Sequence, residues 1–290
     1  MNISRRQYRI LSDHMAVYDF MVEIFEKDWK NGVPAPFMEY ALSSSWMDKS
    51  FVHRNRLWFD GDSIAAFCFY ENPVSDVYFS LRPGYEFLAD EMIEYAFSSM
   101  PRKPDEVHRL VLFSGQNALM NAAERAGYTK TFEYDDMIFD FEGSIDYPLP
   151  DGFRFVPAEE VSIEKCCECC WKGFDHEAEE GAWNQDAEYG YYSIETPHNT
   201  HFMDVVIADS EGEYACYSGM WWVPENKLAY MEPLCTIPKY RKMGLASAAL
   251  SEHCRQMKKL GAAYMTGGGN EFYRKIGYKD RVVWTFWEKR

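Results

Sequence analysis

Three small or charged residues at fixed spacing give this sequence its clearest chemical signal. Arg241, Gly244 and Ala246 read R-x-x-G-x-A, after an apolar segment at 230–237 that Pro238 ends and before a run of helical spacing. Small residues let a backbone approach a ligand closely, and the amides that begin a helix attract anions. The spacing therefore predicts a phosphate-binding turn between a strand and a helix.

This turn lacks the signatures of two common phosphate sites. It contains no lysine followed by Ser or Thr, as a Walker loop requires, and no G-x-G-x-x-G. A nucleoside triphosphate or a dinucleotide is therefore disfavoured as the ligand. An ordinary strand–turn–helix with a glycine turn is the alternative, because short glycine motifs also occur by chance.

A second block at 270–278 reads NEFYRKIGY and contains Tyr273, Gly277 and Tyr278. Together the two blocks resemble the GNAT superfamily of N-acetyltransferases. The first motif of that family reads Q/R-x-x-G-x-G/A, and its last conserved block ends in Y-x-x-x-G-F/Y. The blocks stand here in the family's order, separated by one expected helix and one expected strand at 262–266.

The resemblance implies acetyl-CoA as a co-substrate and no metal. The loop amides would hold its pyrophosphate, and the strand at 234–236 would pair with its pantetheine arm. Asn270 departs from the family pattern, in which the asparagine lies farther before the tyrosine. The cofactor-binding residues expected on this basis are Leu234, Cys235, Thr236, Arg241, Lys242, Met243, Gly244, Leu245, Ala246, Ser247 and Asn270.

Two residues are expected to carry the proton transfers. Tyr273 stands where the family places the general acid that protonates the departing CoA thiolate. Glu232 is the sole acid in its apolar strand, and burial would raise its pKa toward that of a useful base. The alternatives are a core aromatic for Tyr273 and a paired structural carboxylate for Glu232. Lys239, Arg241 and Lys242 are expected to add positive charge beside the phosphates, and a solvated basic cluster is the alternative for them.

The rest of the chain is predicted to supply two similar scaffolds. The pattern of elements restarts after a polar, proline-containing stretch at 142–151, and Arg125–Tyr128 aligns with Lys275–Tyr278. We expect helices at 10–27, 36–44, 86–99, 117–126 and 158–172, and strands at 56–59, 64–70, 77–81, 109–113, 128–141, 153–156, 203–208 and 214–222.

The predicted fold class is α/β (α+β), with two GNAT-like domains in tandem. Each has a mixed, mostly antiparallel central sheet flanked by helices. The predicted boundaries are a degenerate domain at 1–142, a linker at 143–151 and a catalytic domain at 152–290. The first half has a short turn at Arg82–Tyr85 in place of the phosphate loop. One α/β domain with an unrelated N-terminal piece is the alternative.

Composition narrows the choice of partners. The net charge of -16 argues against nucleic acid or an anionic membrane as a partner. No apolar run has the length of a transmembrane helix, so we expect a cytoplasmic protein. Four of the eight cysteines stand at 166–170, where buried structural thiols are favoured, and metal binding or redox chemistry are the alternatives. The sequence does not indicate an oligomeric state.

The expected activity is direct transfer of acetyl from acetyl-CoA to a primary amine of a small molecule. Residues 158–190 contain ten acids and two lysines, which would attract a cationic acceptor, with apolar walls from Trp183, Tyr189, Tyr191 and Tyr192. A solvated acidic surface is the alternative. Competing functions are a non-catalytic acyl-CoA-binding scaffold and a tandem acetyltransferase that resembles mycothiol synthase.

Overall fold

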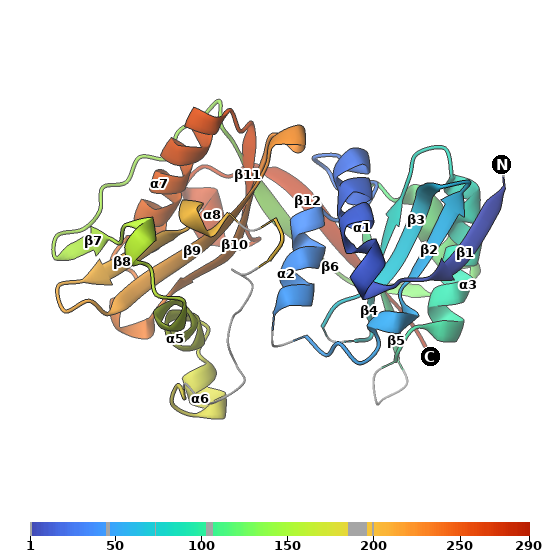
Figure 1. The fold of residues 1–290 in the computed structure, drawn as a ribbon, viewed down its shortest axis with the longest axis horizontal. Coiled ribbons are helices and arrows are strands. Elements are labelled where there is room, and N and C mark those ends of the chain that lie inside the picture. Colours follow the sequence, from blue (N-terminus) through green and yellow to red (C-terminus); the bar gives the residue numbers. More distant parts are fainter. Residues whose placement is uncertain (1, 45–46, 73, 103–106, 185–195, 199) are drawn as a thin grey trace. The chain divides into compact units, whose positions relative to one another are not determined.

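The computed structural model describes residues 2–44, 47–72, 74–102, 107–184, 196–198 and 200–290. The chain divides into two compact units, each built on a sheet with helices packed against it (Figure 1). Unit 1 contains the described residues up to Leu42, then Met47–Asp136 and Arg281–Arg290. Unit 2 contains Met137–Asp280 together with Ser43 and Ser44.

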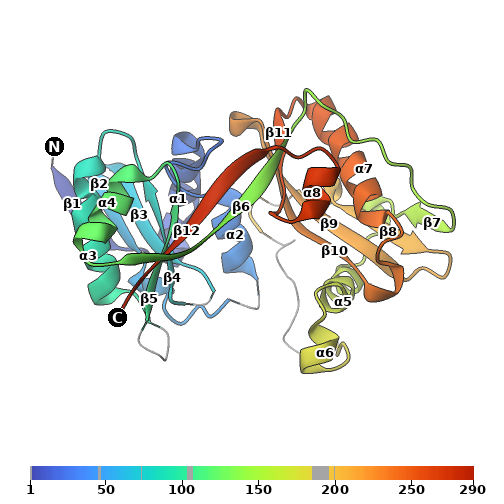
Figure 2. The same cartoon turned by 180° about the vertical axis from the view of Figure 1, so that it is seen from behind.

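Unit 1 has the strand order β1-β2-β3-β4-β5-β12. The strands β4 and β5 run parallel, and the other pairs run antiparallel. Helices α3 and α4 lie together on one face of this sheet (Figure 2). Its elements are β1 (Ile3–Gln7), α1 (Ile10–Ile24), α2 (Ala35–Ser43), β2 (Arg56–Asp60), β3 (Ser63–Tyr70), β4 (Asp76–Leu81), α3 (Ala89–Ser99), β5 (His108–Phe113) and α4 (Asn117–Arg125).

Unit 2 repeats this plan with the order β7-β8-β9-β10-β11-β6, in which β10 and β11 form the parallel pair. Apolar residues of α5 and α7 build separate core clusters with the sheet. Its elements are β7 (Phe153–Phe155), α5 (Ile163–Gly173), α6 (His176–Glu180), β8 (Val205–Asp209), β9 (Tyr214–Val223), β10 (Leu228–Thr236), α7 (Leu245–Leu260), β11 (Tyr264–Thr266) and α8 (Glu271–Lys275).

The two halves of the sequence exchange strands across the predicted domain boundary. The last strand, β12 (Asp280–Lys289), pairs with β5 of unit 1, where Trp284 lies opposite Phe113. The end of β6 (Thr129–Asp140) pairs instead with β11 of unit 2. An edge strand exposes unpaired backbone groups, and each sheet obtains its last partner from the other half of the chain. The compact units therefore differ from the predicted segments 1–142 and 152–290 at these strands.

The predicted fold class is confirmed, and most predicted elements are present within a few residues of their expected bounds. Two strands, β1 and β12, were not predicted. The helix expected at 158–172 is divided into a 3-10 turn at Ala158–Glu160 and α5, whose start is capped by Ser162. Residues 185–190 of the expected acidic loop, and Tyr191 and Tyr192, lie outside the described residues. Among the described residues, no helix combines the length and apolar character needed to cross a bilayer.

Candidate active site

The predicted site lies where β10 and β11 of unit 2 separate. Their parallel pairing is confined to Leu228 with Tyr264 and Ala229 with Met265. Two residues further along β10, the Met231 N–H donates to Thr266 Oγ1 at 2.8 Å. Beyond this point β10 continues along β9 to Thr236. The far part of β10 is therefore paired with a described strand on one side.

A β-bulge at Glu232 and Pro233 interrupts the pairing of β10 with β9. Met231 pairs with Met220 and Leu234 with Ser218, so two residues of β10 lie opposite Gly219. A Cβ atom at Gly219 would lie 2.3 Å from the Glu232 carbonyl oxygen, so glycine is required at this close approach. Proline lacks a ladder donor and is suited to a bulge. The bulge places Glu232, which is partly exposed, in the middle of the strand.

The predicted phosphate-binding turn has the conformation that its sequence requires. After a 3-10 turn at Pro238–Tyr240, Lys242 and Gly244 adopt positive φ angles of 66° and 91°. Helix α7 begins at Leu245, and its first turn is closed by the Ala248 N–H donating to the Gly244 carbonyl at 3.0 Å. The first N–H groups of a helix have no acceptor within it. The exposed residues 241–244 thus lead into a helix start that can receive an anion.

Arg241, predicted to lie beside the phosphates, instead contacts protein groups. Its Nε donates to the Thr236 carbonyl at 3.2 Å, and its Nη2 donates to the Gly173 carbonyl at 2.8 Å and to Asp175 Oδ2 at 3.0 Å. Lys239 pairs with Glu213 at 3.1 Å. Of the predicted basic cluster, Lys242 lies on the exposed part of the loop.

The predicted pantetheine strand presents its side chains to both faces of the sheet. Leu234 packs against the cluster that includes Leu245 and Ala248 of α7. Cys235 is buried against α5, with its Sγ 3.9 Å from the Sγ atoms of both Cys169 and Cys170. All eight cysteines are buried and free. Any pairing of this strand with a ligand would therefore use its backbone.

Tyr273 is held in place by a tight glycine turn. The residue is 7% exposed, and its ring lies 5.1 Å from that of Tyr278. A Cβ atom at Gly268 would lie 2.8 Å from the Tyr273 ring, so glycine lets the turn pass over it. Asn270 caps α8, since its Oδ1 accepts from the Phe272 N–H at 3.0 Å. The cofactor-binding role expected for Asn270 stays a prediction.

Two polar pairs near the bulge, one partly buried and one buried, were not predicted. Asp204 accepts from the Tyr217 hydroxyl and from the Met220 N–H, each at 2.9 Å, and enclosure of its carboxylate raises the pKa well above its usual range. On the α7 face, His253 Nε2 lies 3.0 Å from Ser218 Oγ, and burial lowers the pKa of His253 to about 4. The partners come from separate elements, so local sequence gave no signal for either pair.

In unit 1 a turn of the chain enters the corresponding gap between β4 and β5. Its β4 and β5 also separate after two residue pairs, which are Asp76 with Arg109 and Val77 with Leu110. Beyond them the Leu81 N–H donates to the Asn31 carbonyl at 2.9 Å, and Gln116 Nε2 donates to the Phe79 carbonyl at 3.0 Å.

The segment that enters this gap is the turn between α1 and α2. A Cβ atom at Gly32 would lie 2.9 Å from the Ser80 Cα, which shows how closely the turn approaches β4. Trp29 directs its ring against Phe113 and Trp284, with centroid distances of 5.2 and 5.5 Å. In the loop after β4, the Gly84 N–H already has an acceptor, because it donates to Glu86 Oε1 at 2.9 Å.

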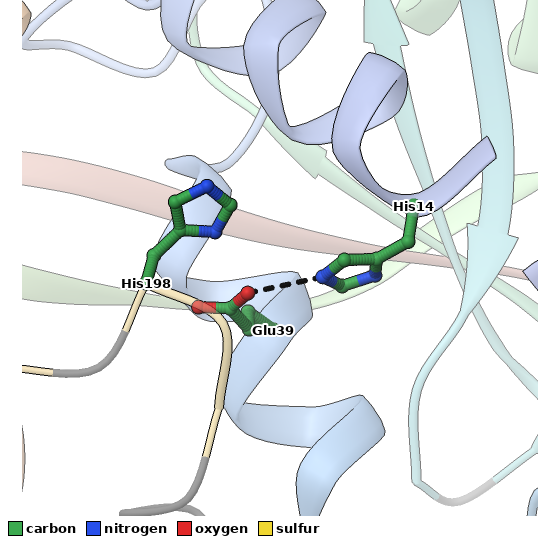
Figure 3. Close-up of side chains that lie close together, drawn as sticks. All are labelled: His14, Glu39 and His198. Carbon is green, nitrogen blue, oxygen red and sulfur yellow. Dashed lines mark hydrogen bonds and ion pairs between the residues drawn. The ribbon is translucent and has the colours of Figure 1, made fainter. Parts of the chain in front are cut away.

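A separate polar pair joins the first two helices of unit 1 (Figure 3). His14 Nε2 on α1 lies 3.0 Å from Glu39 Oε1 on α2, and Glu39 is 1% exposed. A buried carboxylate needs a donor, and the imidazole provides one. The pair therefore stabilises the contact between these helices.

The comparisons with known proteins agree with this geometry. Residues 164–278 match the model of the acetyltransferase (GNAT) family. An acetyltransferase of the GNAT family from Colwellia psychrerythraea is 10% identical, with a TM-score of 0.61 and full coverage of both chains. A GCN5-related N-acetyltransferase from Sphaerobacter thermophilus is 13% identical, with a TM-score of 0.57 and coverage of 99% of this chain and 95% of that one.

A tandem GNAT protein from the clavulanic acid biosynthesis pathway is 12% identical, with a TM-score of 0.57 and coverage of 99% and 98%. No curated protein matches the sequence. The chain thus carries a GNAT domain over residues 164–278, and its fold along the whole length is that of GNAT proteins. Such a domain supports acyl-CoA-dependent N-acyltransferase activity in general.

Proposed function

We propose that this protein transfers an acetyl group directly from acetyl-CoA to a primary amine of a small molecule. One observation carries the proposal. Within the GNAT domain, a helix start that can receive an anion follows directly on the part of β10 that lies beyond its pairing with β11. A pyrophosphate and an amide-containing arm need these two features next to each other.

The chain's own groups would hold acetyl-CoA in two ways. The backbone amides from Lys242 to Ser247 would donate to the pyrophosphate. The backbone of Leu234–Thr236 would pair with the pantetheine arm as an added strand does. Lys242, exposed on the loop, would add positive charge beside the phosphates.

In the proposed reaction the amine nitrogen attacks the thioester carbonyl carbon, a C–N bond forms and the C–S bond breaks. Glu232 would accept the proton that the amine loses, through a water molecule. Tyr273 would donate a proton to the departing sulfur, because its hydroxyl is neutral at pH 7. The glycine turn that fixes the Tyr273 ring supports this role, since a general acid must be well positioned.

We further propose that the acceptor is a cationic amine. Glu177 and Glu179 are exposed on α6, in the region between the first strand and β8 where the acceptor is expected. Some acids of this region are paired within the protein, as Glu168 is with Lys172 at 2.8 Å. The cytoplasm is the proposed location, since free thiols stay reduced there.

Two other functions stay open. A non-catalytic acyl-CoA-binding protein would bind acetyl-CoA without turnover, whereas the fixed Tyr273 favours a catalyst. A tandem acetyltransferase like mycothiol synthase would share the same chemistry, and the tandem GNAT neighbour favours this possibility.

The proposal is tested by incubating the purified protein with a cell extract and isotopically labelled acetyl-CoA, followed by mass spectrometry of the products. We expect a labelled N-acetylated small molecule from the wild-type protein. The same product should form more slowly with Tyr273→Phe. Binding of acetyl-CoA with no labelled product in any extract would favour the non-catalytic protein. Absence of acetyl-CoA binding would reject both.

A further inference from the structure

Arg241 ties the phosphate-binding loop to the first helix of unit 2. Its guanidinium donates to carbonyl groups at the end of β10 and at the end of α5, and to the Asp175 carboxylate between α5 and α6. Asp175 lies two residues after the end of α5, at the N-cap of α6, and has a positive φ of 64°. Three separate segments therefore meet at one side chain.

The chemistry of these contacts suits a structural clamp. The carbonyl groups at a helix C-terminus carry partial negative charge and attract a cation such as Arg241. A guanidinium has a rigid fork of donors, so contacts to Thr236, Gly173 and Asp175 fix its orientation. An isolated surface ion pair contributes little, but a charge shared among several acceptors contributes more. The Nη2 donor of Arg241 is thereby directed at the end of α5.

Unit 1 has a similar set of arginine contacts after β4, where its sequence lacks the phosphate-binding motif. Arg82 follows β4, and its Nε donates to the Ile64 carbonyl at 3.0 Å. Its Nη2 donates to Glu23 Oε2 on α1 at 2.8 Å. In both units an arginine that follows the fourth strand is bound to an acid at the end of the first helix or just beyond it. Since the loop of unit 1 lacks the R-x-x-G-x-A spacing, the role that both arginines share is to hold the helix.

We propose that Arg241 is a positioning residue that couples the acetyl-CoA loop to α5 and α6, and that it does not bind phosphate itself. This inference rests on the proposed function. The clamp would fix the amides of 242–247 for the pyrophosphate. It would also link the cofactor loop to the helices expected to border the acceptor.

Calorimetric titration with acetyl-CoA of Arg241→Gln, Asp175→Asn and the double variant tests the proposal. We expect about tenfold weaker binding for Arg241→Gln and a smaller loss, about threefold, for Asp175→Asn, because both remove the same charged contact. The double variant should be no weaker than Arg241→Gln. If Arg241 binds phosphate directly, Asp175→Asn frees it, and binding becomes tighter or stays unchanged; this result would overturn the proposal.

Lys239→Gln is the matched control, because it removes the same charge from the same loop and Lys239 contacts Glu213 instead of α5. We expect its affinity to stay within twofold of the wild type. Hydrogen exchange of the 242–247 amides supplies a second measurement that needs no cofactor. Exchange should be faster in Asp175→Asn than in the wild type, and unchanged exchange would contradict the clamp. If the wild type binds no acetyl-CoA, the proposed function fails, and the exchange rates still decide whether the clamp exists.

Discussion

Each unit has a gap where its two parallel strands separate, and the two gaps differ in what the chain places there. In unit 1 the turn that contains Trp29 and Asn31 enters the gap and hydrogen-bonds to β4. In unit 2 the described chain supplies one side-chain hydrogen bond to the backbone of Leu234–Thr236, from Arg241. The shared topology therefore does not decide which unit can bind a cofactor. We propose that binding depends on whether the protein already satisfies the hydrogen-bonding groups of the strand edge and of the loop after it.

The loops after the fourth strand sharpen this comparison. Gly84 in unit 1 and Gly244 in unit 2 have nearly equal φ angles of 89° and 91°. The Gly84 N–H, however, is bound to the carboxylate of Glu86, which places negative charge where a phosphate would have to lie. Gly244 is instead the N-cap of a helix of 16 residues. Glycines with similar φ angles thus belong to a closed turn in one unit and to the proposed anion site in the other.

The largest effect is expected at this pair of glycines. Gly244→Glu should abolish acetyl-CoA binding, because it adds bulk and negative charge at a left-handed position beside the proposed pyrophosphate. Gly84→Glu is the matched control, with a similar φ and open space around it, and should leave affinity unchanged. Calorimetry measures both. Equal losses in the two variants would contradict the assignment of the site to unit 2.

Removing the side chain that fills the gap of unit 1 should cost stability. Trp29 is 4% exposed and packs against two other aromatic rings. Trp29→Ala should lower the free energy of unfolding by about 3–5 kcal/mol, as large core truncations do. Phe132→Ala, at a residue that is 59% exposed, is the control and should change it little. Urea denaturation followed by tryptophan fluorescence and circular dichroism gives the values; equal losses would refute the role of Trp29.

The proposed acid should show its effect in turnover. Tyr273→Phe keeps the ring that packs against the glycine turn and removes the hydroxyl. We expect kcat to fall tenfold or more, within the range for a placed general acid, with acetyl-CoA affinity nearly unchanged. Tyr278→Phe, which removes a buried hydroxyl from the neighbouring ring, is the control. Equal kcat values for Tyr273→Phe and wild type, under conditions limited by chemistry, would reject Tyr273 as the acid.

The last predicted effect is gradual, because it is spread over a range of pH. Burial lowers the pKa of His253 to about 4, below the value near 6.5 of an unfolded histidine. Between these pH values the unfolded chain binds the extra proton, so stability is present above about pH 6.5 and is lost as pH falls toward 4. The loss is about 1.4 kcal/mol for each pH unit in that window.

His253→Gln should flatten this part of the curve of unfolding free energy against pH. Exposed His53→Gln is the control and should leave the slope as it is in the wild type. Urea denaturation at a series of pH values supplies the curve. A slope that does not change in His253→Gln would show that His253 titrates normally in the folded protein.

The sequence predicted those parts of the fold and site that depend on nearby residues. The turn at Gly244 and the start of α7 follow from a glycine that precedes apolar residues at helical spacing. The strand β10 follows from the apolar segment that Pro238 ends. These features are local, since backbone conformation and helical spacing are set within a few residues.

The features that were missed depend on residues far apart in the chain. Trp284 pairs opposite Phe113, and no local pattern indicates which edge strand β12 will join. The turn at Trp29 enters the gap beside β4 only in the folded protein. The contact of Arg241 with α5 likewise joins residues more than 60 positions apart. Such contacts are selected by tertiary packing, which a motif does not encode.

The difference between the units is tested most directly by the number of acetyl-CoA molecules that the intact protein binds. Isothermal titration calorimetry of the wild-type chain measures this number and the affinity together. We expect one molecule per chain, bound in unit 2, with the same value for Gly84→Glu. Two equal sites in the wild-type protein, or a single site that Gly84→Glu removes and Gly244→Glu leaves intact, would contradict the proposal that the turn in the gap of unit 1 excludes the cofactor.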